Sequence, residues 1–124
     1  MLKPSDGIEG VKKAIIETVK GAGGNACPPM FVGVGIGGDF EKCAFLSKKA
    51  LTRDFNKHSD IDYVKRLEEE LLEKLNKLGL GPGGLGGTTT VLGINIETYP
   101  THIAGLPVAI NICCHVNRHV KRII

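Results

Sequence analysis

The chain's cysteines are the residues whose chemistry depends most on where the fold places them. Cys27 follows a glycine-rich turn and precedes two prolines, so its thiol sits on a stiff loop just after a predicted helix. Metal ligands favour such fixed positions, although a loop cysteine taken alone is more often a buried structural thiol. Cys43 falls on the apolar face of a predicted helix, which indicates a core position.

Cys113 and Cys114 end the last predicted strand, where alternation sends one side chain to each face of a sheet. At most one of the two can therefore point at a given site. The four cysteines do not predict a disulfide framework, because the adjacent pair can hardly bond to each other and no small secreted domain is indicated. Thiol or metal chemistry is the better interpretation.

His102 lies in the turn predicted between the last two strands. An imidazole in a loop is a plausible proton donor or acceptor during catalysis. No partner for it is evident in the sequence. An ordinary surface histidine therefore remains the alternative interpretation.

Glycine is the compositional anomaly, with 17 of 124 residues concentrated at 21–24, 33–38 and 79–87. Each cluster separates periodic segments and predicts a shaped loop. Gly33, Gly35 and Gly38 form a G-x-G-x-x-G after a predicted strand, as in a dinucleotide loop. No following parallel strand ends in the expected acid, so close backbone packing or an anion at the next helix start explains the glycines at least as well.

The third glycine cluster runs directly into three threonines at 88–90. Its backbone amides could cradle a carboxylate or a phosphate. It is not a Walker motif, because no lysine precedes the threonines. A tight, bulged entry to a strand, with threonines present for their β-propensity, is an equally good interpretation.

The elements that must position these residues follow from hydrophobic periodicity. Helices are predicted from Ser5 and Asp6 to about residue 22, from Asp39 to about residue 51, and over 60–78; strands are predicted over 30–34, 88–99 and 107–113. On the second helix, the inner face is expected to carry Phe40, Cys43, Ala44 and Ala50 or Leu51. The order α-β-α-α-β-β predicts an α/β fold with a small mixed β-sheet covered by helices, as a single domain over residues 1–124.

Charge and hydropathy exclude several classes of function. The net charge of +3 is small and mixed along the chain, so no nucleic-acid partner is expected, and the basic residues 118–122 lack aromatic neighbours that could stack on bases. No segment approaches the roughly 18 apolar residues of a membrane helix, and no signal peptide is recognisable. We expect a cytoplasmic protein.

Four sequence blocks carry a resemblance to a known family. They are residues 21–29 (Gly-Ala-Gly-Gly-Asn-Ala-Cys-Pro-Pro), 32–38 (Val-Gly-Val-Gly-Ile-Gly-Gly), 46–51 (Leu-Ser-Lys-Lys-Ala-Leu) and 85–109, which opens with Leu-Gly-Gly-Thr-Thr-Thr and closes with His-Ile-Ala-Gly-Leu-Pro-Val-Ala. They resemble the alpha region of class I, iron–sulfur-dependent fumarate hydratases and tartrate dehydratases. The resemblance covers nearly the whole chain.

The resemblance implies a 4Fe-4S cluster held by three cysteines, with one iron left free to bind the substrate hydroxyl and carboxylate. It assigns Cys27 as one ligand and Cys114 as another, because Cys114 has Arg118 four residues later, as in the family. Cys113 remains an alternative. His102, twelve residues before Cys114, is similar to the family's active-site histidine.

The chain lacks other parts that the family has. The family's first cluster cysteine, with an adjacent acid, belongs to an upstream segment, and further substrate-binding residues belong to the beta region. We therefore expect the C-terminal portion of an alpha subunit that works with the remainder of that subunit, a beta subunit and a dicarboxylate substrate in an oligomer. The isolated chain is expected to bind no cluster and to be inactive; iron at cluster stoichiometry would contradict this.

The predicted reaction of the complete enzyme is the reversible hydration of fumarate to (S)-malate. Tartrate dehydratase is the alternative within the family. From other classes, a non-catalytic anion- or nucleotide-binding module and a subunit-docking module remain open. The proton-abstracting base is expected to lie outside this chain.

Overall fold

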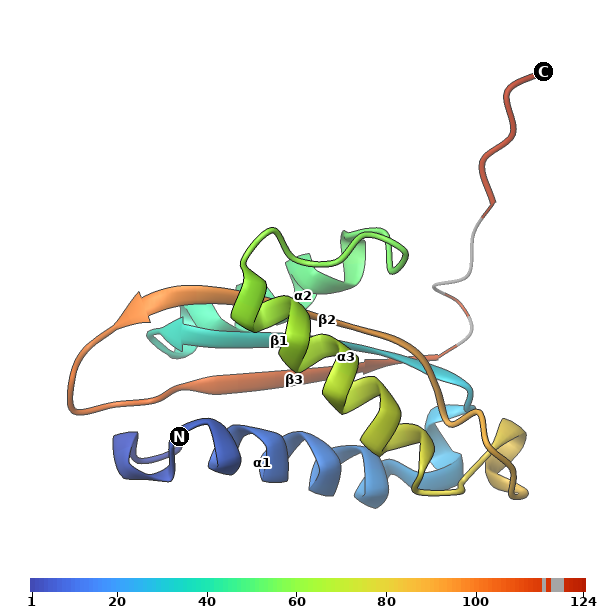
Figure 1. Cartoon of the computed structure of the whole chain (residues 1–124), viewed down its shortest axis with the longest axis horizontal. Coiled ribbons are helices and arrows are strands. Elements are labelled where there is room, and N and C mark those ends of the chain that lie inside the picture. Colours follow the sequence, from blue (N-terminus) through green and yellow to red (C-terminus); the bar gives the residue numbers. More distant parts are fainter. Residues whose placement is uncertain (115, 117–119) are drawn as a thin grey trace.

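The computed structural model of the chain describes residues 1–114, 116 and 120–124 (Figure 1). Its helices and strands are α1 (Gly7–Ala22), β1 (Met30–Gly38), α2 (Phe40–Thr52), α3 (Asp62–Asn76), β2 (Val91–Thr101) and β3 (Val108–Cys113), with short 3-10 turns η1 (Pro4–Asp6), η2 (Gly23–Ala26) and η3 (Pro82–Gly84). The predicted order of elements and the α/β class are confirmed.

The three strands form one mixed sheet in the order β2-β1-β3. The central strand β1 runs parallel to β2 and antiparallel to β3. The consecutive strands β2 and β3 therefore do not pair with each other but lie on opposite sides of β1. The turn between β2 and β3 crosses over the end of β1 (Figure 1).

The two faces of the sheet are packed differently, and the alternation of residues along β1 explains this. Even-numbered residues such as Val32 and Val34 face a core shared with α1 and α3. The buried members of that core are Val11, Ile15, Val19, Met30, Val32, Val34, Val64, Leu67, Leu71, Leu75, Val91, Ile94 and Ile96. The odd-numbered positions of β1 include glycines, and α2 packs on that face.

The glycines at 33–38 belong to strand β1, so the predicted loop at this position is wrong. A Cβ at Gly35 would overlap the carbonyl oxygen of Cys43 and lie 2.7 Å from the nitrogen of Ser47, and one at Gly33 would overlap the carbonyl oxygen of Ser47. The glycines therefore admit the backbone of α2 to the sheet. This geometry also removes the dinucleotide-loop interpretation, because α2 fills the space in front of them.

Gly35→Ala is expected to lower the free energy of unfolding by about 3 kcal/mol, because α2 must move away from the sheet. Urea denaturation of both proteins measures this. Gly21→Ala is the matched control, since Gly21 is helical and a Cβ there would meet nothing within 4 Å. The control should leave stability unchanged or raise it by up to about 1 kcal/mol. A Gly35→Ala protein as stable as the control would contradict this account of the packing.

Helix α2 begins where the sequence predicts, since the Asp39 carboxylate accepts a hydrogen bond from the Lys42 amide at 2.7 Å. Its inner face is predicted only in part. Phe40 is 63% exposed and Ala44 is also exposed, so these two assignments are wrong. Leu46 and Ser47 are buried instead, alongside Cys43 and Ala50. Three of the buried positions of α2, Cys43, Leu46 and Ser47, are among those that approach Gly33 and Gly35 most closely.

A buried carboxylate lies at the free edge of β2. Glu68 on α3 is 1% exposed, and its Oε1 accepts a hydrogen bond from the Ile96 amide at 2.8 Å. The same oxygen is bonded to the Arg53 guanidinium, which also donates to the Ile96 carbonyl at 3.2 Å. The amide of Ser59 donates to the other Glu68 oxygen at 3.2 Å. This pair therefore joins α3, the end of α2 and the edge of the sheet.

Asn76 likewise bonds to the backbone of β2, at the start of the strand. Its Oδ1 accepts hydrogen bonds from the amides of Thr90 and Val91, both at 2.8 Å, and its Nδ2 donates to the Val91 carbonyl at 3.1 Å. One side chain at the end of α3 thus satisfies three backbone groups. It fixes the point at which the glycine loop becomes a strand.

Candidate functional site

Cys27 lies in a sharp turn between η2 and β1. Its backbone is left-handed, with φ 49° and ψ 58°, and its amide donates to the Gly24 carbonyl at 3.2 Å. The residue is exposed, in contrast to Cys43. The turn therefore presents the thiol outward at the end of the sheet where β1 begins.

The antiparallel pairing of β1 and β3 brings the C-terminal cysteines to the same end. Cys113 lies opposite Phe31 in the register, four residues after Cys27. Cys114 follows directly, beyond the last pair. Residues separated by more than eighty positions in the sequence are thus gathered at one edge of the fold, which the sequence alone does not reveal.

The register also distinguishes the two adjacent cysteines. Asn111 is on the α2 face, since its Nδ2 donates to the Ser47 hydroxyl at 2.9 Å. Alternation within β3 puts Cys113 on the same face as Asn111, whereas Cys114 lies beyond the last residue of the strand. The Cys27 turn follows α1 and η2 directly. The register therefore turns Cys113 toward the α2 face and does not fix the direction of Cys114.

Cys43 is unsuited to a ligand role. It is 1% exposed and its Sγ donates a weak hydrogen bond to the Phe40 carbonyl at 3.4 Å. Burial raises the pKa of the Cys43 thiol, so the thiolate that binds metals is disfavoured. The core position predicted for this residue is confirmed.

His102 lies at the other end of the sheet from the cysteines. It follows Thr101, which pairs with Gly38 at the far end of β1, whereas Cys27 precedes Met30 at the near end. Nine residues of strand separate the two ends, which corresponds to roughly 26 Å. Within this chain the structure does not bring His102 to Cys27 or Cys114.

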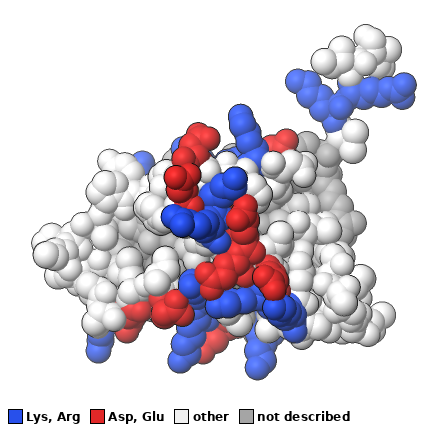
Figure 2. All heavy atoms as spheres, in the orientation of Figure 1, with Lys and Arg blue, Asp and Glu red and all other residues white. Residues whose placement is uncertain are grey.

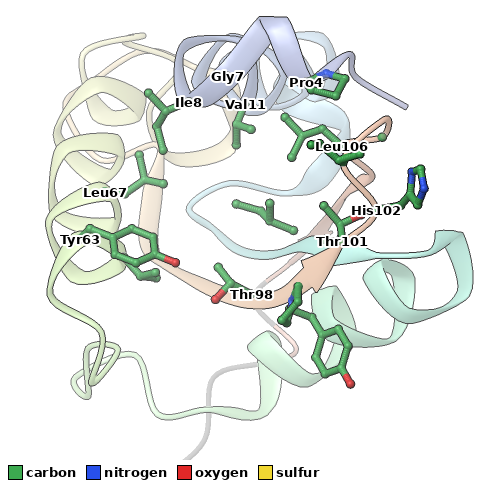
Figure 3. A pocket seen from close by; sticks show the side chains of 17 residues that line it. Pro4, Gly7, Ile8, Val11, Tyr63, Leu67, Thr98, Thr101, His102 and Leu106 are labelled. Atoms are coloured by element: carbon green, nitrogen blue, oxygen red, sulfur yellow. The ribbon is translucent and has the colours of Figure 1, made fainter.

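His102 instead borders a cavity of about 450 Å³ between α1, α3 and the end of the sheet. Ile8, Val11 and Leu67 give the cavity apolar walls, and the His102 ring is directed away from its centre (Figure 3). The imidazole is exposed, and its Nδ1 accepts a hydrogen bond from the Ala104 amide at 3.1 Å. The other ring nitrogen, Nε2, is available to a group from outside this chain.

The glycine loop at 81–87 packs beside the Cys27 turn. The Gly83 amide donates to the Pro28 carbonyl at 2.8 Å, and Gly84 lies against Gly24. Most amides of the loop have acceptors within the protein, namely those of Gly81, Gly83, Gly84, Leu85 and Gly86. The buried Thr90 hydroxyl is the acceptor for Gly81, at 3.1 Å. This arrangement favours the tight entry to a strand over the anion cradle.

The contact between the two glycine clusters is the part of the site that sequence reasoning missed. The clusters at 21–24 and 81–87 are conspicuous in the sequence, but nothing in their spacing shows that they touch. The only available signal was that both glycine-rich segments border the same end of predicted strands. Their meeting depends on the parallel pairing of β1 and β2.

Thiol donors at this end of the sheet fit an iron–sulfur cluster in type, although the described residues hold no group of three or more His, Cys, Asp or Glu side chains that could bind a metal. Cys27 is exposed, Cys114 is partly exposed, and thiolate sulfur is the usual cluster ligand. Because the cluster needs more than two ligands, the others would come from groups outside the part of the chain described. Arg118, four residues after Cys114 in the family pattern, lies outside the described residues.

Acidic and basic side chains are mixed over α1 and α3 on the face shown in Figure 2. Ion pairs such as Lys12 with Glu70, at 2.9 Å, and Lys74 with Glu70, at 2.7 Å, account for much of this mixture. That face shows no continuous basic patch. Among the described residues, no helix has the length and apolar composition required to cross a membrane.

The chain matches the model of the fumarate hydratase (Fumerase) family over residues 1–123. It is 50% identical over 124 residues to a protein of Methanocaldococcus jannaschii named "Putative L(+)-tartrate dehydratase subunit alpha", covering 99% of this chain and 44% of that protein. It is 41% identical over 118 residues to "L(+)-tartrate dehydratase subunit alpha" of Escherichia coli strain K12, covering 95% of this chain and 39% of that protein. The chain thus spans less than half the length of these relatives, and it belongs to the fumarate hydratase (Fumerase) family.

Proposed function

We propose that this chain is the C-terminal portion of the alpha subunit of a hydro-lyase that removes water from a 2-hydroxy dicarboxylate. The family match over residues 1–123 is the observation that carries the proposal. The gathering of Cys27 and Cys114 at one end of the sheet supports it, because a cluster site requires both. The relatives' names, which designate alpha subunits, support a beta-subunit partner.

Cys27 and Cys114 are proposed to hold a 4Fe-4S cluster, with the third ligand supplied by the remainder of the alpha subunit. When bound, the cluster would supply a free iron that polarises the leaving hydroxyl as a Lewis acid. The chain's own contribution would be two cysteine ligands at the end of the sheet where β1 begins. The four cysteines are free thiols, which supports a proposed location in the reducing environment of the cytoplasm.

His102 is proposed to contact substrate and to exchange a proton through its exposed ring nitrogen. Because roughly 26 Å of strand separates it from Cys27, the two residues of one chain do not face one substrate. His102 therefore acts in a site that is completed by another chain or another copy. Its Nδ1 is held by the Ala104 amide, which fixes the ring and leaves Nε2 free for that contact.

The substrate is proposed to be either malate, in equilibrium with fumarate, or L(+)-tartrate. The two substrates differ by one hydroxyl, and the relatives' names favour tartrate. A non-catalytic nucleotide module is disfavoured, because the glycines that suggested it are packed against α2. A purely docking role has no specific observation in its favour.

The decisive experiment is anaerobic assembly of the full-length alpha subunit with its beta subunit, followed by iron analysis and assay. Fumarate formation from malate is followed by ultraviolet absorbance, and oxaloacetate formation from tartrate by a coupled dehydrogenase. We expect dehydration of at least one substrate, with the higher kcat/KM identifying the natural one. An iron-replete complex that dehydrates neither substrate would contradict the proposed function.

A further inference from the structure

The turn that carries Cys27 is held on both sides by a segment distant in the sequence. Before Cys27, Gly24 lies against Gly84, where a Cβ on Gly84 would be only 2.7 Å from the Gly24 Cα. After Cys27, the Pro28 carbonyl accepts the Gly83 amide at 2.8 Å. Two adjacent residues of η3 thus contact the residues that flank Cys27.

Cys27 needs such support because its own backbone is unfavourable. Its φ of 49° lies in the left-handed region, which residues with a Cβ rarely adopt. Such a conformation persists only where the surrounding structure determines it. The local hydrogen bond from the Cys27 amide to the Gly24 carbonyl, at 3.2 Å, is at the upper end of the usual range, and the contacts from η3 add a second constraint on the turn.

We infer that Gly84 is a positioning residue for Cys27. Because Gly84 has no side chain, the glycine loop can approach Gly24. This approach allows the Gly83 amide to donate to the Pro28 carbonyl and fixes the direction of the Cys27 thiol. The contact itself is independent of any cluster. Its importance for ligation rests on the proposed function.

The chain offers unusually close controls. Gly84→Ala adds a Cβ that collides with Gly24 at a residue with φ of 74°. Gly83→Ala adds the same group at φ of 65°, where it meets only Leu85, at 3.7 Å. Gly24→Ala changes the other side of the contact, but its Cβ would lie at an ordinary 3.5 Å from the Gly83 carbonyl oxygen. The difference between Gly84→Ala and Gly83→Ala therefore isolates the collision from the backbone strain.

The test is amide hydrogen exchange of this chain by NMR, with protection in α1 and α3 reporting the global fold. In Gly84→Ala, exchange at the amides of Cys27 and residue 83 should rise at least about tenfold, while both control variants stay within about threefold of the parent protein. A second measurement needs no variant: the α protons of Gly24 and Gly84 should give a nuclear Overhauser effect. Equal exchange in Gly84→Ala and Gly83→Ala, or absence of that effect, would overturn the inference.

A separate measurement relates the contact to the proposed cluster. In the complete enzyme, Gly84→Ala should retain less iron than Gly83→Ala after gel filtration. Equal retention would overturn the role of Gly84 in ligation. If the parent enzyme itself carries no iron, the proposed function fails, whereas the exchange data still decide whether Gly84 holds the turn.

Discussion

Cys27→Ser in the complete enzyme is expected to remove the visible absorption of an iron–sulfur cluster and to lower kcat/KM for dehydration more than about 100-fold. Even the loss of a group that only supports a metal ligand typically costs 10–100-fold, and Cys27 is proposed to be a ligand itself. The serine keeps the shape of the exposed residue. The fold should therefore survive, which circular dichroism can verify.

The matched comparison uses the other cysteines. Cys43→Ala should keep the cluster and the activity, because that thiol is 1% exposed and lies in the α2 packing. Cys114→Ser should behave like Cys27→Ser, and Cys113→Ser should not, because alternation directs Cys113 to the α2 face. Full iron content in Cys27→Ser would contradict the assignment, and loss of iron only in Cys113→Ser would exchange the roles of the adjacent pair.

Glu68→Ala is expected to lower the free energy of unfolding by about 3–5 kcal/mol, because it removes the buried carboxylate bonded to the Arg53 guanidinium and leaves Glu97, at 3.3 Å, as the remaining acidic partner. Arg53 has a side-chain exposure of 18%, and the amides of Ser59 and Ile96 also lose their acceptor. Urea denaturation monitored by circular dichroism measures the loss. Glu68→Gln should lose less, because the amide oxygen can still accept from the Ile96 backbone.

The control for Glu68 is its neighbour on the same helix. Glu69 has a side-chain exposure of 51%, and the His58 imidazole lies 4.0 Å from its carboxylate. Glu69→Ala should change stability by no more than about 0.5 kcal/mol, as is usual for exposed charges. Equal losses for Glu68→Ala and Glu69→Ala would show that the buried pair does not stabilise the edge of the sheet.

The sequence predicts the elements of this fold better than their arrangement. Helix α3 is recovered from its leucine spacing and the last two strands from their β-branched residues, since these are local signals. The order β2-β1-β3 is not predicted, because pairing between distant strands leaves no local period. The glycines at 33–38 were misassigned because a small residue indicates either a turn or close packing, and only the position of α2 decides between them.

The residues of the candidate site could also be predicted from the sequence, whereas their arrangement could not. The type and approximate position of Cys27 follow from the sequence and the family resemblance. Its proximity to Cys114, and the distance of both from His102, follow only from the register of β1 with β2 and β3. The cysteines and His102 lie at opposite ends of the same strand, so their spacing in the sequence says nothing about a shared site.

The side chains bonded to β2 have a consequence for association between copies of the chain. An open sheet edge offers backbone groups on which a strand of another molecule can be templated, and this is a common route to aggregation. Glu68 and Arg53 occupy both backbone groups of Ile96, and Asn76 occupies both groups of Val91. Glu68, Arg53 and Asn76 therefore protect this edge of the sheet from pairing with a strand of another copy.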